Sequence, residues 1–259
     1  MSYAGKFSPS MPWWERVGLP ARGLRSPQDF MPLVAFWNRR LIFAAIILVV
    51  AGFAIAFSST APSPHAQGTY LIIFIHVPAA WVSLALYVLM ALWSGAGFAL
   101  RRPCFAMMAQ AIAPTGAMLA LLALCTGSLW DRQSQRTWWD VQLAVEMTVF
   151  MLYLAIILFR AAMEDSRWSD LVAGATTLAG LACLSLIFGS WSHWPSVESF
   201  LRVSLASPGP MFRAAAGLAA VTLGLWLHAT AVILLRLRCV VLERERGSDW
   251  VEGHRGEAR

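Results

Sequence analysis

Six long, continuous apolar runs constrain the fold of this chain more than any other feature of its sequence. An α-helix needs about 20 apolar residues to cross a bilayer core of about 30 Å, and each run reaches or approaches that length. A closed membrane barrel would instead show alternating segments of about ten residues. The sequence therefore predicts an all-α integral membrane protein with six transmembrane helices, in the runs 41–57, 77–98, 104–129, 141–159, 171–188 and 211–235.

The composition agrees with a membrane protein. Of the 259 residues, 58% are hydrophobic and only 13% are charged, about half the charged fraction of an ordinary soluble domain. Residues 1–40 are polar and basic and the first apolar run begins late, so no cleavable signal peptide is expected. The four cysteines show no metal-type spacing and fall in or beside the apolar runs, so a disulfide framework is not expected either.

The basic residues are distributed unevenly between the loops. Sixteen of the twenty Lys and Arg residues fall on the side of the two termini, and the exceptions are Arg132, Arg136, Arg202 and Arg213. The positive-inside rule then predicts that both termini are cytoplasmic. The net charge of +6 follows this topology, so it does not indicate nucleic-acid binding. We expect a cytoplasmic arm over 1–40, a six-helix membrane domain with periplasmic loops over 41–238, and a cytoplasmic tail over 239–259.

Tryptophans gather on the side predicted to face the periplasm. An aromatic belt at the membrane interface would explain them, because many polytopic proteins have one. The run Trp138-Trp139-Asp140 differs from such a belt, since it is a tight cluster that ends in an acid within a polar loop. The members of the whole group are Trp81, Trp130, Trp138, Trp139, Trp191 and Trp194.

Two histidines are predicted near this cluster. Pro78 is tolerated in the first turn of a helix, so we expect the second helix to start there and to place His76 at the outer surface. His193 lies between two tryptophans in the third outer segment. Imidazole is an axial ligand of haem iron, and indole rings offer apolar area to a porphyrin face. An ordinary hydrogen-bonding role for each histidine remains the alternative.

Further polar residues lie within the predicted spans. Gln142 and Glu146 are spaced i, i+4 and should share one face of the fourth span, and a carboxylate there should face protein or water. His228 lies in the middle of the sixth span, where an ionisable residue is a functional candidate by default. A neutral histidine bonded to a neighbouring helix is the alternative for His228.

At these residues the chain resembles CcmC, the haem-handling membrane family of cytochrome c maturation within the tryptophan-rich WWD group. The matching stretches are Ile73-Phe-Ile-His-Val-Pro-Ala-Ala-Trp81, Ala113-Pro-Thr-Gly116, Thr126-Gly-Ser-Leu-Trp130 and Thr137-Trp-Trp139, and Asp140 and Glu146 keep the family's spacing. The similarity covers about 67–237, most of the chain.

The resemblance implies a function without bond-making chemistry, so no enzymatic activity is expected. Such a protein holds haem b transiently and non-covalently at the outer face of the bacterial inner membrane. It presents the haem to a periplasmic haem chaperone resembling CcmE. The implied partners are an ABC-type ATPase and its membrane subunit, resembling CcmA and CcmB, and a small single-span helper resembling CcmD. The sequence has no Gly-rich loop ending in Lys-Ser/Thr, so energy coupling would come from another subunit.

The resemblance also implies residue roles. His76 would be an axial ligand of the haem iron, Trp138 and Trp139 would support the porphyrin, Trp130 would line the site, and Asp140 would position the loop.

The chain departs from the family pattern at several places. The family signature Trp-Trp-x-Trp-Asp is two residues shorter here, and Gln142 stands where the family has an arginine. The family's second axial histidine follows a tryptophan by four residues, a position that Glu198 occupies when counted from Trp194. His193, Glu198, water or a partner therefore remain open as the second ligand.

Two alternatives of other classes remain. A cofactor-free membrane scaffold subunit of an ABC-type assembly complex would explain the altered tryptophan signature, as would a diverged paralogue that no longer binds haem. A transporter of haem or of a small solute would show broken spans with polar groups near the midplane. His228 and a kink at Pro114 are the only candidates for such features. The sequence favours haem presentation over the scaffold, and the scaffold over transport.

The predicted topology can be tested with reporter fusions. Fusions after residue 65, 134 or 200 should report a periplasmic location, and fusions after residue 102, 165 or 250 a cytoplasmic one, because the arginine asymmetry fixes the orientation. A cytoplasmic signal at residue 134 would contradict the prediction most directly, since the tryptophan cluster would then face the wrong side.

Overall fold

The computed structural model describes residues 27–58, 67–100, 103–133, 141–163, 166–189 and 209–257. Within these ranges all residues but Met163 and Gly209 are helical, and six helices each contain a segment long and apolar enough to cross a membrane. This confirms the predicted all-α class with six spans. The helices are α2 (Pro27–Ser58), α3 (Gln67–Leu100), α4 (Pro103–Gln133), α5 (Val141–Ala162), α6 (Ser166–Gly189) and α8 (Pro210–Glu257).

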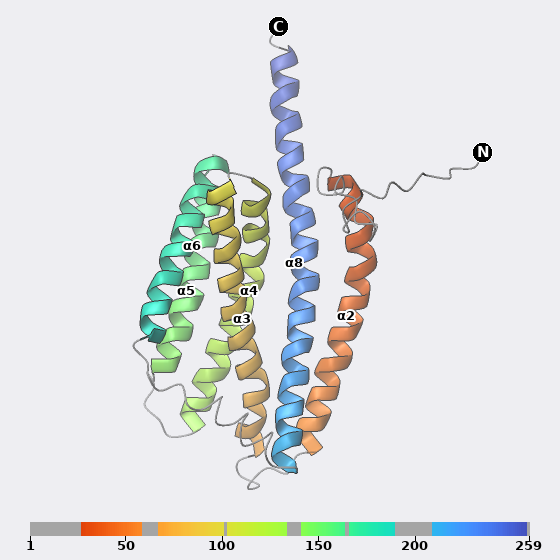
Figure 1. Ribbon diagram of the computed structural model, residues 1–259, viewed down its shortest axis with the longest axis vertical. Helices are drawn as coiled ribbons and strands as arrows, with labels where there is room; N and C mark the ends of the chain where they lie inside the picture. Colours follow the sequence, from red (N-terminus) through yellow and green to blue (C-terminus); the bar gives the residue numbers. More distant parts are fainter. Residues whose placement is uncertain are drawn as a thin grey trace, which may run out of the picture.

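The helices form a bundle with an adjoining pair (Figure 1). Helices α3, α4, α5 and α6 run alternately up and down and pack on one another, and α2 and α8 lie beside them as an antiparallel pair. Helix α8 also contacts α3 and α4, whereas α2 packs mainly on α8. Helix α8 therefore joins α2 to the bundle, and it extends beyond the other helices at one end.

Two tyrosines lock the centre of the bundle. Tyr87 of α3 and Tyr153 of α5 are completely buried, and their rings meet edge to face with centroids 5.2 Å apart. Tyr87 donates a hydrogen bond to the carbonyl of Thr177 over 3.2 Å, and Tyr153 donates one to the carbonyl of Ser83 over 2.8 Å. Both phenols are thus satisfied in a core that excludes water, as buried hydroxyls must be.

Helices α2 and α8 approach each other through small residues. A Cβ added to Gly52 would lie 2.8 Å from the carbonyl oxygen of Gly217, and a Cβ on Gly224 would lie 3.0 Å from that of Ala45. Small residues allow helix backbones to come together in membranes, where packing replaces the hydrophobic effect as the driving force. The glycines therefore account for the close pairing of α2 with α8.

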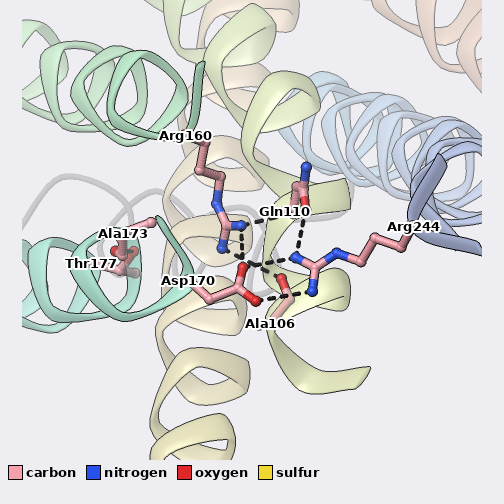
Figure 2. Close-up of polar contacts among 7 residues, drawn as sticks. All are labelled: Ala106, Gln110, Arg160, Asp170, Ala173, Thr177 and Arg244. Atoms are coloured by element: carbon pink, nitrogen blue, oxygen red, sulfur yellow. Dashed lines mark hydrogen bonds and ion pairs between the residues drawn. The ribbon is translucent and has the colours of Figure 1, made fainter. Parts of the chain in front are cut away.

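A charged network ties four helices together at one end of the bundle (Figure 2). The carboxylate of Asp170 on α6 accepts hydrogen bonds from Arg160 on α5 over 2.7 Å and from Arg244 on α8 over 2.8 and 3.0 Å. Gln110 of α4 accepts from Arg244 over 3.2 Å, and Ala106 accepts from Arg160 over 3.5 Å. One carboxylate thus holds two guanidinium groups, and the charge-assisted bonds connect α8 to the bundle.

Four helix boundaries differ from the sequence prediction. Helix α3 begins at Gln67, so Pro78 lies inside the helix and the predicted helix start at Pro78 is wrong. Pro78 is fully buried, and neighbouring helices make an interior proline tolerable in a membrane bundle. Helix α2 begins at Pro27, within the predicted arm, and α4 continues to Gln133. Helix α8 continues as far as Glu257, well beyond the predicted span 211–235 and through most of the predicted tail.

Removal of Asp170 should destabilise the bundle. The Asp170→Ala variant leaves two partly buried guanidinium groups facing each other, and breaking a fully buried pair costs about 3–5 kcal/mol. Because the side chains of Arg160, Asp170 and Arg244 keep 11%, 17% and 27% exposure, we expect the free energy of unfolding to fall by about 2 kcal/mol. Tryptophan fluorescence during unfolding in mixed detergent micelles measures this value.

The matched control removes an exposed acid from α8. Glu243→Ala should change the unfolding free energy by less than about 0.5 kcal/mol, as surface substitutions usually do. The double variant Asp170→Ala/Arg244→Ala should recover part of the loss, because one uncompensated charge is then absent. Equal stability of Asp170→Ala and Glu243→Ala would show that the network does not hold the bundle together.

Candidate functional site around His76

His76 lies inside α3 and is only 8% exposed. Its Nδ1 atom is 3.1 Å from the carbonyl oxygen of Ala123 on α4, and 3.4 Å from the hydroxyl of Thr126 one turn further along. Because a carbonyl oxygen can only accept, the hydrogen is on Nδ1, which donates it to Ala123. In the neutral ring this bond fixes the tautomer, and Nε2 then carries the free lone pair.

The Nε2 atom of His76 faces the beginning of α5. The side-chain nitrogen of Gln142 is 3.1 Å away, and the Oε1 atom of Glu146 is 3.3 Å away. In the neutral ring, Nε2 accepts a hydrogen bond from the Gln142 amide, and in the protonated ring it donates to the Glu146 carboxylate. The structure confirms that Gln142 and Glu146 share one face and that Glu146, at 9% exposure, faces protein.

Gly127 makes room for this arrangement. A Cβ added at Gly127 would lie 2.9 Å from the Cε1 atom of His76 and 3.1 Å from the Oε2 atom of Glu146. Ala123, Thr126 and Gly127 are spaced i, i+3 and i+4, so they present one face of α4 to the imidazole. A glycine is therefore needed at this position of the Thr126-Gly-Ser-Leu-Trp130 stretch, because the His76 ring approaches the α4 backbone closely.

The position of His76 within α3 corrects the predicted helix start. The sequence placed this residue at the outer surface, at the start of a helix. In the structure α3 begins at Gln67, so His76 lies within the helix and its ring packs against α4 and α5. The first turns of α3 and α5 and the last turns of α4 lie at one end of the bundle (Figure 1). The histidine lies toward that end of the bundle, beside Gln142 in the first turn of α5, and is covered by polar groups from two neighbouring helices.

The remaining candidates from the sequence are not placed. Trp130 belongs to α4, but its side chain is not among those described. The residues Trp138, Trp139, Asp140, His193 and Glu198 lie outside the described residues. His228 is exposed on α8.

Sequence reasoning missed three parts of the site. The carbonyl of Ala123, the close approach at Gly127 and the contact of Gln142 with His76 all depend on how the helices pack. Only Gly127 carried a signal, because it stands in a Thr-Gly-Ser stretch within an apolar helix. A glycine at such a position often marks a close contact between helices.

The chemistry of His76 fits one axial position of haem. A metal-binding histidine almost always donates its other ring hydrogen to a carbonyl or a carboxylate, which is what Nδ1 does with Ala123. The porphyrin nitrogens already bind the haem iron, so the protein needs to supply only the axial ligands. Within the described ranges no group of three or more His, Cys, Asp or Glu side chains could hold a metal ion.

The fold and the site together define a polytopic helical membrane protein that holds one oriented histidine near an end of its bundle. The comparisons with known proteins identify the group to which it belongs. The family model described as CcmC, Heme exporter protein C, matches residues 21–252. The chain belongs to the CcmC family, which confirms the resemblance found in the sequence.

Individual relatives agree with this assignment. Heme exporter protein C of Escherichia coli (strain K12) is 30% identical over 214 residues, which cover 82% of this chain and 86% of the relative. Heme exporter protein C of Bradyrhizobium diazoefficiens is 34% identical over 178 residues, covering 68% and 67%. A putative cytochrome c biosynthesis ccmC-like mitochondrial protein of Marchantia polymorpha is 34% identical over 147 residues, covering 56% and 62%.

Substitution of Gly127 should disturb the site directly. In Gly127→Ala the new methyl group would collide with His76, and overpacking of this kind usually costs about 1–3 kcal/mol. The control is Gly95→Ala in α3, where the nearest side-chain atom would be 3.8 Å from the new Cβ. Thermal unfolding in detergent should show a clear loss for the first variant and little change for the second. Equal melting temperatures would mean that α4 does not depend on the glycine.

Proposed function

We propose that this protein handles haem for cytochrome c maturation, holding haem b transiently and non-covalently at the outer face of the bacterial inner membrane. The proposal includes presentation of that haem to a periplasmic haem chaperone of the CcmE kind. The observation that carries it is the orientation of His76, whose Nδ1 hydrogen goes to Ala123 and whose Nε2 atom turns toward the start of α5. The names of the relatives, which describe haem exporters and cytochrome c biosynthesis, support the same function.

The tryptophan cluster belongs to the proposed site through chain connectivity. Trp138, Trp139 and Asp140 directly precede Val141, where α5 begins, and three extended residues span at most about 11 Å. Trp139 is therefore tied within that distance of Gln142, which contacts His76. We assign Trp138 and Trp139 to support of the porphyrin face, Asp140 to positioning of the loop, and Trp130 to the wall of the site.

The second axial ligand would come from the third outer segment, from water or from a partner. His193 and Glu198 are the candidates in this chain, with water or a partner's side chain as the alternatives. Substitution of His193 and of Glu198 distinguishes these possibilities. Loss of the second ligand changes the haem spectrum, whereas a residue that is not a ligand leaves it unchanged.

The proposed complex includes partners that supply energy. The sequence has no phosphate-binding loop, so an ABC-type ATPase and its membrane subunit, of the CcmA and CcmB kind, would do this work together with a small CcmD-like helper. The protein itself would make and break no covalent bonds, and this proposal gives it no enzymatic activity.

Transport through the bundle has less support in the structure than presentation at its surface. Discontinuous helices near the bilayer midplane are typical of transporter sites. Here α3 continues through Pro78 and α4 continues through Pro114, and each is described as a single helix. The polar site around His76 lies instead beside Gln142 in the first turn of α5, and that turn is at one end of the bundle (Figure 1).

The absorption spectrum of the purified protein tests the proposal. The wild type should show a Soret band, and His76→Ala should lose most of the bound haem or shift the band, because an axial ligand is gone. His193→Ala and Glu198→Ala should each alter the spectrum only if that residue is the opposite ligand. A protein without a Soret band after haem is supplied would instead indicate the cofactor-free scaffold.

The tryptophan pair provides a separate test. Each ring contributes mainly apolar contact, worth roughly 1.5–3 kcal/mol when well buried. The double variant Trp138→Ala/Trp139→Ala should therefore retain much less haem per folded protein while inserting normally into the membrane. Replacement of Trp168, which is 63% exposed on α6, is the control and should leave haem content unchanged. If the pair forms only an aromatic belt, both variants will hold as much haem as the wild type.

A further inference from the structure

Gln142 is hydrogen-bonded to Nε2 of His76, the atom that would bind iron in the proposed function. Its side-chain nitrogen lies 3.1 Å from Nε2, and the Nδ1 atom is already engaged with Ala123. A neutral imidazole has a single free lone pair on Nε2, so a hydrogen bond from Gln142 and a coordinate bond to iron exclude each other. A ligand can therefore reach Nε2 only if the Gln142 side chain moves, while the Oε1 atom of Glu146 lies beside the same nitrogen at 3.3 Å.

The two α5 residues beside Nε2 differ in their freedom to move. Glu146 is buried, at 9% exposure, and also lies against the space that Gly127 leaves open. Gln142 is exposed and stands in the first turn of α5, which begins at Val141. A glutamine at the surface can rotate its amide into water without opening the core. Of the two, Gln142 is the group that can leave.

We propose that Gln142 is a positioning residue that shields the Nε2 atom of His76 and is displaced when an electrophile, in particular the haem iron, binds there. The inference rests on the proposed function for the identity of the iron, but the shielding itself can be measured without haem. Gln142 holds the ring so that Nε2 faces the start of α5, and it competes with the incoming ligand. Glu146 stays beside the ring after Gln142 has moved.

Haem-binding kinetics of the whole protein in detergent test the competition. In Gln142→Ala one hydrogen bond no longer has to be broken, so haem should bind about two- to tenfold more tightly, the range that corresponds to one exchanged hydrogen bond. The gain should appear in the association rate, with the dissociation rate and the Soret spectrum unchanged. Gln142→Asn, whose amide is too short to reach, should behave like Gln142→Ala.

The matched control removes an amide from the opposite end of the bundle. Gln110→Ala takes away a group that contacts Arg160 and Arg244, and its association rate should equal that of the wild type. A faster dissociation rate in Gln142→Ala would overturn the proposal, because it would show that Gln142 contacts haem in the bound protein. Unchanged affinity and unchanged rates would overturn it as well.

Chemical modification of His76 tests the shielding by Gln142 without haem. Diethyl pyrocarbonate modifies a free imidazole nitrogen, and mass spectrometry can follow His76 and the exposed His228 in the same sample. Relative to His228, the modification rate of His76 should rise about two- to tenfold in Gln142→Ala, by the same hydrogen-bond argument. An unchanged ratio would overturn the shielding. A raised ratio in a protein that binds no haem would support the shielding and overturn the proposed function, so the two failures are distinguishable.

Discussion

The hydrogen bond from Nδ1 of His76 to the carbonyl of Ala123 is the interaction on which the site depends. It joins residues 47 positions apart in the sequence and so requires α3 and α4 to be packed in one register. Gly127 allows that register, because any side chain there would meet the imidazole. Once Nδ1 is committed to Ala123, the remaining nitrogen must face α5. The helix packing therefore decides which atom of the histidine is available for chemistry.

The rest of the bundle keeps this arrangement in place. The tyrosine pair at the centre binds carbonyls on α3 and α6, and the Asp170 network at the far end holds α4, α5, α6 and α8 together. Helix α5 takes part in both and also carries Gln142 and Glu146 beside His76. Since a helix is a stiff element with a fixed rise of about 1.5 Å per residue, fixing α5 at its centre and far end also fixes its first turn.

The sequence predicted the elements well and their contacts poorly. Hydropathy is a local property, so six spans could be read from apolar runs alone, and the shared face of Gln142 and Glu146 followed from helical periodicity. The start of α3 was wrong because proline was taken as a first-turn residue, while tertiary packing tolerates Pro78 inside the helix. Asp170 and Arg244 are 74 positions apart, and no pattern in one sequence links them. The tryptophan cluster and the third outer segment stay predictions.

Pulsed electron paramagnetic resonance of ferric haem bound to the protein, with histidine labelled by nitrogen-15, tests the central claim most directly. The claim is that Nε2 of His76 ligates the iron, so the wild type should show hyperfine coupling from a labelled imidazole nitrogen. In His76→Ala, reconstituted with the same haem, the number of histidine side chains coupled to the iron should fall by one. An identical set of couplings in the two proteins would contradict the account, because the oriented imidazole of His76 would then have no bond to the iron.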